Sequence, residues 1–121
     1  MNDTRPELPK ILAIDFDGCL CTNRWPEIGE PNYAVILAAI GRRVRRGWKL
    51  ILWTCRTGEK LTEAVDWCRR YGLEFDAVNA NLPEVIEAFG ADCRKITATE
   101  YWDDCARRMR AEEVRLDDLL D

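Results

Sequence analysis

The chain contains no histidine among its 121 residues, and this absence removes several classes of chemistry. Serine and cysteine hydrolases that use a histidine base are excluded, and so are zinc hydrolases built on an HExxH helix. Near neutral pH, proton transfer must then fall to carboxylates, lysine, tyrosine or thiols. Chemistry carried out by aspartates is one of the few kinds that remain.

Paired metal-binding cysteines are also missing. The six cysteines include no CxxC pair, and no histidine can complete a zinc site, so structural zinc is not expected. No apolar run is long enough to span a bilayer, and residues 1–9 lack the apolar centre of a secretory signal. The expected location is therefore the cytoplasm, where the cysteines stay reduced, and no membrane partner is expected.

The composition fits one globular domain over residues 1–121, with flexible ends at 1–9 and 117–121. The chain is 47% hydrophobic, which is enough for one core without disulfides. Although the net charge is −4, four arginines crowd residues 42–46. They are interpreted as cations that complement the dipole at the end of a helix, rather than as a nucleic-acid patch.

Short apolar runs alternate with segments of helical periodicity along the chain. This alternation predicts an α/β fold with a parallel sheet and right-handed crossovers. Gly47 is placed to end the first helix in the left-handed conformation. The expected strands are residues 11–16, 49–54, 75–78 and a strand ending at 103, and the expected helices are residues 32–46, 59–71, 83–89 and 106–120.

Two aspartates follow the first expected strand. Residues 11–18 read Ile-Leu-Ala-Ile-Asp-Phe-Asp-Gly, which places Asp15 and Asp17 at the carboxyl edge of the sheet, where open α/β sheets bind ligands. Gly18 permits a sharp turn after them. Two carboxylates this close repel each other unless a cation or a shared proton lies between them, so the pair indicates a hard cation such as Mg²⁺. The alternative is a strand followed by an ordinary Asp-Gly turn.

Two further apolar runs end in polar residues in the same way: residues 50–53 lead into Thr54, and residues 101–102 lead into Asp103 and Asp104. The ordered set hhhDxDG, hhhT, a basic residue and hhDD resembles the four motifs of the haloacid-dehalogenase-like (HAD) phosphohydrolase superfamily. The resemblance extends to a small capless family of bacteria and phages and covers nearly residues 10–105. It is carried by PEIG at 26–29, LILWTCR at 50–56, WC at 67–68, FDAVN at 75–79 and RKI at 94–96.

The resemblance implies a three-layer Rossmann-like parallel sheet with helices on both faces. HAD enzymes insert specificity caps after the first or the third strand, and here residues 19–31 and 79–83 are too short for a cap domain. We therefore expect a capless, open site with at most a small flap. Such a site suits a large phosphorylated substrate, or a homo-oligomer in which a second subunit supplies the lid.

The resemblance also implies roles for the motif residues. Asp15 would be the nucleophile that forms an aspartyl-phosphate, and Asp17 the general acid and base. Asp103 and Asp104 would hold Mg²⁺ together with Asp15 and the backbone carbonyl of Asp17, although aspartates there are also typical helix N-caps. Thr54 would bind phosphate through its hydroxyl group and nearby backbone N–H groups, or else cap the next turn.

The cation that would face the phosphate is the least determined residue. The resemblance selects Lys95, but a straight strand over residues 95–103 would place it about 25 Å from Asp103. The chain is therefore predicted to bend between Ile96 and Tyr101, which would bring Lys95 to the carboxylates. Arg56, whose planar fork suits phosphate, and Lys60 are the alternatives, and Arg56 is nearly as well interpreted as a surface arginine.

The expected function is that of a magnesium-dependent phosphomonoester hydrolase, with a nucleotide or a nucleic-acid end as substrate. One alternative is a catalytically weak binding or regulatory module on the same fold, which would not need both Asp15 and Asp17. The other is a receiver-like phosphoacceptor domain, but no aspartate ends the third strand, where Asn79 stands instead. Trp25, in the loop after the DxDG motif, is predicted to pack against the domain rather than to stack on a base or sugar.

Overall fold

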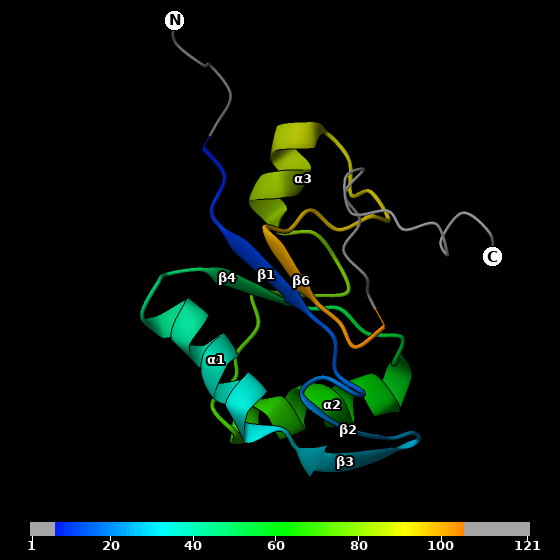
Figure 1. The fold of residues 1–121 in the computed structure, drawn as a ribbon. Helices are drawn as coiled ribbons and strands as arrows, with labels where there is room; N and C mark the ends of the chain where they lie inside the picture. Colours follow the sequence, from blue (N-terminus) through cyan, green and yellow to red (C-terminus); the bar gives the residue numbers. More distant parts are fainter. Residues whose placement is uncertain (1–6, 106–121) are drawn as a thin grey trace, which may run out of the picture.

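The computed structural model describes residues 7–105. Its centre is a four-stranded parallel sheet with the strand order β5-β4-β1-β6 (Figure 1). The strands are β1 (Ile11–Ile14), β4 (Lys49–Leu52), β5 (Ala77–Val78) and β6 (Glu100–Trp102). This is the α/β architecture predicted from the alternation of strands and helices, and it is compatible with a Rossmann-like fold. The helix predicted over residues 106–120 lies outside the described residues.

Three helices connect the strands: α1 (Tyr33–Val44), α2 (Gly58–Arg70) and α3 (Pro83–Phe89). All three were predicted, with bounds that differ by at most two residues. Gly47 follows α1 with a φ of +70°, the left-handed conformation expected there. None of these helices has the length and apolar character needed to cross a bilayer.

The core consists of two apolar clusters that share the strands. Side chains alternate along a strand, so β1 sends Leu12 and Ile14 into one cluster and Ile11 and Ala13 into the other. Figure 1 shows α1 and α2 on the opposite side of the strands from α3, and the clusters agree with it. Burial on both faces explains why β1 reads as an unbroken apolar run. The first cluster includes Ile36, Ala39, Ala64 and Trp67, and the second includes Leu82, Val85 and Ile96.

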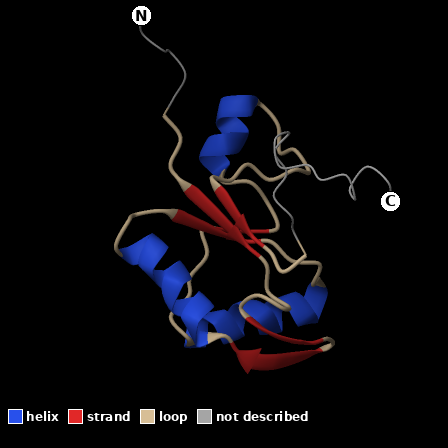
Figure 2. Cartoon of the chain, in the orientation of Figure 1, coloured by secondary structure: helices blue, strands red, loops and turns tan. Residues whose placement is uncertain are grey.

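A β-hairpin occupies the stretch expected to hold a small flap. Strands β2 (Cys21–Arg24) and β3 (Glu27–Pro31) pair antiparallel and form a separate two-stranded sheet (Figure 2). Asn32 ties the base of the hairpin to the chain that leaves β1, because its Nδ2 donates to the backbone oxygen of Cys19 at 2.8 Å. The hairpin is therefore anchored next to the carboxyl end of β1.

The arginine cluster at the end of α1 takes part in ion pairs. Arg42 pairs with Glu100 at 3.2 Å, and Arg43 pairs with Asp76 at 3.5 Å. Both acids lie at the amino-terminal ends of strands, so these arginines are at the end of the sheet away from Asp15. Their position agrees with the interpretation of these arginines as cations at a helix end rather than as a nucleic-acid patch.

Candidate active site

The register of the strands places the predicted site residues side by side at the carboxyl edge of the sheet. Ile14 lies beside Leu52 on β4 and Trp102 on β6, so the residues that follow these strands meet at one edge. A cleft of about 460 Å³ opens there. It is lined by Asp15, Asp17, Asn23, Trp53, Thr54, Cys55, Asp103, Asp104 and Cys105. Five residues predicted from the sequence, namely Asp15, Asp17, Thr54, Asp103 and Asp104, therefore share one cleft.

Asp15, which lines this cleft, is half-buried. Burial raises the pKa of its carboxyl group from 3.8 to about 6, and the backbone N–H of Phe16 opposes this rise. The carboxylates of Asp103, Asp104 and Asp17 raise the pKa further. The site thus disfavours the negative charge on Asp15, and a bound cation would relieve this cost.

Asp103 and Asp104 provide the oxygen atoms that such a cation would need. Together with the Cys105 thiol, they place three potential ligand atoms within 4.8 Å of one another. The nearby Asp104 carboxylate raises the pKa of the Cys105 thiol, which favours the neutral thiol and makes it a poor ligand. The remaining donors are carboxylate oxygens, which suit a hard cation such as Mg²⁺. The Asp103 carboxylate also accepts the Cys105 N–H at 2.9 Å, within the turn that follows β6.

Gly18 lets Asp104 approach the DxDG turn. Its φ is +85°, and a Cβ atom at this position would collide with the Asp104 carboxylate. The turn therefore needs glycine for its backbone conformation, and a larger residue would also displace the Asp104 carboxylate. The glycine predicted to permit a sharp turn also makes room for a candidate metal ligand.

We expect Gly18→Ala to lower the free energy of unfolding by about 2 kcal/mol, because the substitution adds both backbone strain and a collision. Gly90→Ala is the matched control, since Gly90 has a φ of +75° and nothing lies near its missing Cβ. Urea unfolding of both variants measures the difference. Equal losses in the two would show that Asp104 does not restrict this position.

Thr54 and Asn79 form one clamp on the loop after β4. The Thr54 hydroxyl oxygen accepts the Arg56 N–H at 3.1 Å, so the predicted turn-capping role is present. The Thr54 backbone N–H donates to the Asn79 side chain at 2.7 Å, and it is therefore not available to a phosphate. The Thr54 hydroxyl proton is still able to donate into the cleft.

Sequence reasoning did not include Asn79 in the site. The residue follows β5 with a φ of +53°, a conformation that asparagine tolerates better than most residues. Besides accepting from Thr54, its amide nitrogen lies 3.4 Å from the Arg56 carbonyl oxygen. The signal that could have found it is its place directly after a strand, which matches the places of Asp15 and Asp103.

Arg56 is the largest departure from the predicted site. Its side chain is 1% exposed, so the interpretation as a surface arginine is wrong. The guanidinium forms a fork on Asp17, with Nε donating to Oδ2 at 2.8 Å and Nη2 donating to Oδ1 at 2.7 Å. It also donates to the carbonyls of Pro26 and Glu27, at 3.4 and 3.1 Å. The hydrogen bond to Asp17 raises the pKa of Arg56 further.

These contacts make Arg56 a candidate positioning residue for Asp17 and leave few of its donors for the phosphate contact predicted from its planar fork. Most of its donors are taken by Asp17 and by the hairpin carbonyls, and bidentate pairs of this kind fix geometry as well as charge. The guanidinium also lies 5.0 Å from the centre of the Phe16 ring and 4.9 Å from the centre of the Trp25 ring. Arg56 therefore orients Asp17 and ties the hairpin to the site.

Lys95 does not reach the cleft. The chain before β6 is irregular, as the predicted bend required, and β6 begins only at Glu100. Within residues 7–105, however, the exposed Lys95 forms no ion pair with Asp15 or Asp103. The neighbouring Ile96 is buried in the cluster under α3, and the Thr99 N–H donates to Ile11 at the amino end of β1. Burial of Ile96 thus fixes the segment away from the carboxyl edge.

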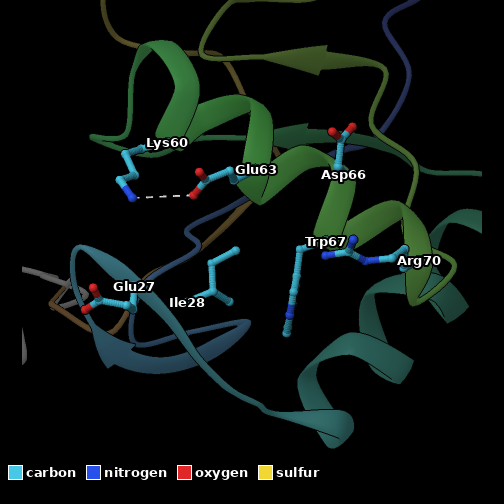
Figure 3. Close-up of a pocket in the computed structure, with 7 residues that line it drawn as sticks. All are labelled: Glu27, Ile28, Lys60, Glu63, Asp66, Trp67 and Arg70. Carbon is cyan, nitrogen blue, oxygen red and sulfur yellow. Dashed lines mark ion pairs between the residues drawn. The ribbon is translucent and has the colours of Figure 1, made fainter.

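Lys60, the other alternative cation, belongs to a different surface. It lies in a groove of about 540 Å³ between α2 and the hairpin, where its ammonium group is 3.6 Å from Glu63 (Figure 3). Glu27, Ile28, Asp66, Trp67 and Arg70 line the rest of that groove. Among the side chains of residues 7–105, no lysine or arginine lines the Asp15 cleft.

The fold matches a solved structure, that of a conserved protein coded by a locus from Bacteroides thetaiotaomicron. The two superpose with a TM-score of 0.68 and are 37% identical in sequence, and the match covers 82% of this chain and 78% of that chain. No family model and no curated protein matches the sequence. At this identity and coverage, the chain belongs to the same family as the conserved Bacteroides thetaiotaomicron protein.

Proposed function

We propose that the chain is a magnesium-dependent phosphomonoester hydrolase of the HAD type, with a capless three-layer fold and an aspartyl-phosphate intermediate. The observation that carries the proposal is the meeting of Asp15, Asp17, Asp103 and Asp104 in one cleft at the carboxyl edge of the sheet. In a chain without histidine, such a cluster supplies both the nucleophile and the proton-transfer group.

In the proposed reaction, a carboxylate oxygen of Asp15 attacks phosphorus and the bond to the leaving oxygen breaks. The Asp17 carboxyl group gives its proton to that oxygen. Asp17 then takes a proton from water, whose oxygen attacks the aspartyl-phosphate, releases inorganic phosphate and restores Asp15. Mg²⁺, held by Asp15, the Asp17 carbonyl, Asp103 and Asp104, would neutralise charge that develops on the phosphoryl oxygens.

Two features support the division of labour between the two aspartates. The Arg56 fork holds both oxygens of Asp17, at 2.7 and 2.8 Å, and thereby fixes the orientation of the carboxylate beside the site of proton transfer. Asp15 is not held by any described side chain, and it lies among carboxylates that a bound cation would neutralise. The proposed nucleophile thus depends on the metal and the proposed acid depends on Arg56.

A binding or regulatory module on the same fold is the second candidate. It is favoured by one observation, the lack of a lysine or arginine on the described wall of the cleft. Phosphoryl transfer normally relies on such a cation beside the metal. A receiver-like domain has less support, because Asn79 is engaged in clamping the loop after β4.

The deciding experiment is a hydrolysis panel with Mg²⁺ and with chelator, covering an aryl phosphate, mononucleotides, sugar phosphates and phosphorylated oligonucleotides. We expect Mg²⁺-dependent release of phosphate and loss of activity in chelator. Mg²⁺ should also raise the melting temperature, since a ligand that binds only the folded state stabilises it. A rise in melting temperature without hydrolysis of any panel member would favour the binding module.

A further inference from the structure

A second cavity opens beside the Asp15 cleft and has no role in the reaction proposed above. Its volume is about 330 Å³, which lies near the lower end of the range of about 300–1,000 Å³ for small-molecule pockets. Asp17, Asn23 and Cys55 line both this cavity and the cleft, while Trp25 and Arg56 complete the smaller one. We call the smaller cavity the Trp25 pocket. A group bonded to a phosphate at Asp15 would have this pocket as its neighbour.

Trp25 is exposed but held in place. Its side chain is 57% exposed, so the prediction that it packs against the domain is only partly met. The Arg56 guanidinium lies 4.9 Å from the ring centre, and that guanidinium is itself fixed by Asp17 and by two hairpin carbonyls. The Trp25 backbone N–H donates to the Asn23 side chain at 3.2 Å. An exposed indole with this support is an ordered stacking surface.

The lining of the pocket favours one kind of occupant. The indole offers an apolar face, and the positive charge of Arg56 is already paired with Asp17. Within the described part of the chain, the Asn23 amide nitrogen donates to no partner, so it is available to an acceptor on a ligand. These features suit a planar, uncharged ring with hydrogen-bonding atoms on its edge. A nucleobase has this chemistry, and bases stack well on aromatic side chains.

We propose that the Trp25 pocket binds the base of a nucleoside monophosphate whose phosphate lies against Asp15. The placement of the phosphate rests on the proposed function, and the pocket adds the substrate class. Trp25 is then a specificity residue that contacts the base, while Asn23 donates to the edge of the ring.

The kinetic test compares two substrates that differ only in the base: adenosine 5′-monophosphate and ribose 5-phosphate. With Mg²⁺, Trp25→Ala should lower kcat/KM for the nucleotide by about tenfold or more and leave the sugar phosphate nearly unchanged. Trp25→Phe should recover most of the loss. Phe89→Ala, which removes an aromatic side chain that is 63% exposed at the end of α3, should change neither substrate.

Equal losses on both substrates would overturn the proposal, because Trp25 would then act only by supporting Arg56 and Asp17. No loss on either substrate would overturn it as well. Titration with adenosine, which has no phosphate, measures binding of the base independently of hydrolysis. Binding of adenosine to the wild type that is lost in Trp25→Ala supports the pocket even if no phosphate ester is hydrolysed. If the protein hydrolyses an aryl phosphate but adenosine does not bind in a Trp25-dependent way, the proposed base-binding pocket is overturned and the proposed phosphatase activity is retained.

Discussion

Replacing Asp15 with asparagine is expected to abolish hydrolysis and, at the same time, to stabilise the metal-free fold. Turnover should fall by at least about a thousandfold, because an amide cannot replace the carboxylate nucleophile. Stability should rise because the folded site disfavours the Asp15 charge, as its pKa of about 6 indicates. After allowance for solvent screening of this half-buried group, the gain at pH 8 should be on the order of 1 kcal/mol.

The pH dependence of this gain has a definite sign. The folded state binds the Asp15 proton more tightly than the unfolded state, whose carboxyl group has the ordinary pKa of 3.8. The wild type therefore carries no penalty from Asp15 below pH 4, and it loses stability as the pH rises from 4 through 6. Urea unfolding in chelator should give the variant a higher free energy of unfolding than the wild type at pH 8, and the same free energy of unfolding below pH 4.

Asp66→Asn is a suitable control for the Asp15 variant. Asp66 lies on α2 with its side chain 56% exposed and lines no part of the cleft. Its replacement should leave turnover within about twofold and stability within about 0.5 kcal/mol of the wild type. Wild-type turnover in Asp15→Asn would remove Asp15 as the nucleophile. Loss of turnover accompanied by a loss of stability at pH 8 would show that the carboxylate is structural.

The sequence predicts the sheet edge well, because the relevant signals are local. Each strand of the carboxyl edge is a short apolar run that ends in a polar residue, and parallel register places such ends side by side. Asp15, Thr54 and Asp103 can therefore be grouped in one site from their positions in the sequence alone. The same reasoning, applied to the end of the third strand, would have added Asn79.

The orientation of Arg56 could not be predicted in the same way. Its partners are Asp17, 39 residues earlier, and the carbonyls of Pro26 and Glu27, which the hairpin brings to it. A periodicity in the sequence specifies whether a segment is helix or strand, but not which distant carbonyl a long side chain reaches. The exposure of an arginine at a strand end is thus decided by the fold of a loop.

The position of the Lys95 side chain could not be predicted from the sequence either. The bend before β6 was predicted because the resemblance selects Lys95 and a straight strand would leave it far from Asp103, and the chain is irregular there. Where the ammonium group points depends on tertiary contacts: Ile96 enters the cluster under α3, and Thr97 donates its N–H to Asn81 at 2.8 Å. These contacts place Lys95 outside the cleft, although the chain is irregular where the bend was predicted.

Arg56→Ala is expected to be the most destabilising single change near the site. It removes a buried cation, leaves the Asp17 carboxylate unpaired, and deprives two hairpin carbonyls of donors. Because the Asp17 side chain is only 18% exposed, the loss should be about 3 kcal/mol in urea unfolding. Arg56→Lys keeps the charge but not the fork, so it should regain part of the stability and little of the turnover.

A double-mutant cycle with Asp17→Asn isolates the contribution of this ion pair from that of the hairpin carbonyls. A coupling of at least about 1 kcal/mol is expected, since both guanidinium contacts to Asp17 are lost together. Arg69→Ala is the matched control: Arg69 is also an arginine paired with an aspartate, but its side chain is 65% exposed and the pair distance is 3.8 Å. That variant should lose less than about 0.5 kcal/mol. A coupling near zero between Arg56 and Asp17 would mean that the fork does not hold the carboxylate, and the assignment of Arg56 as its positioning residue would have to be withdrawn.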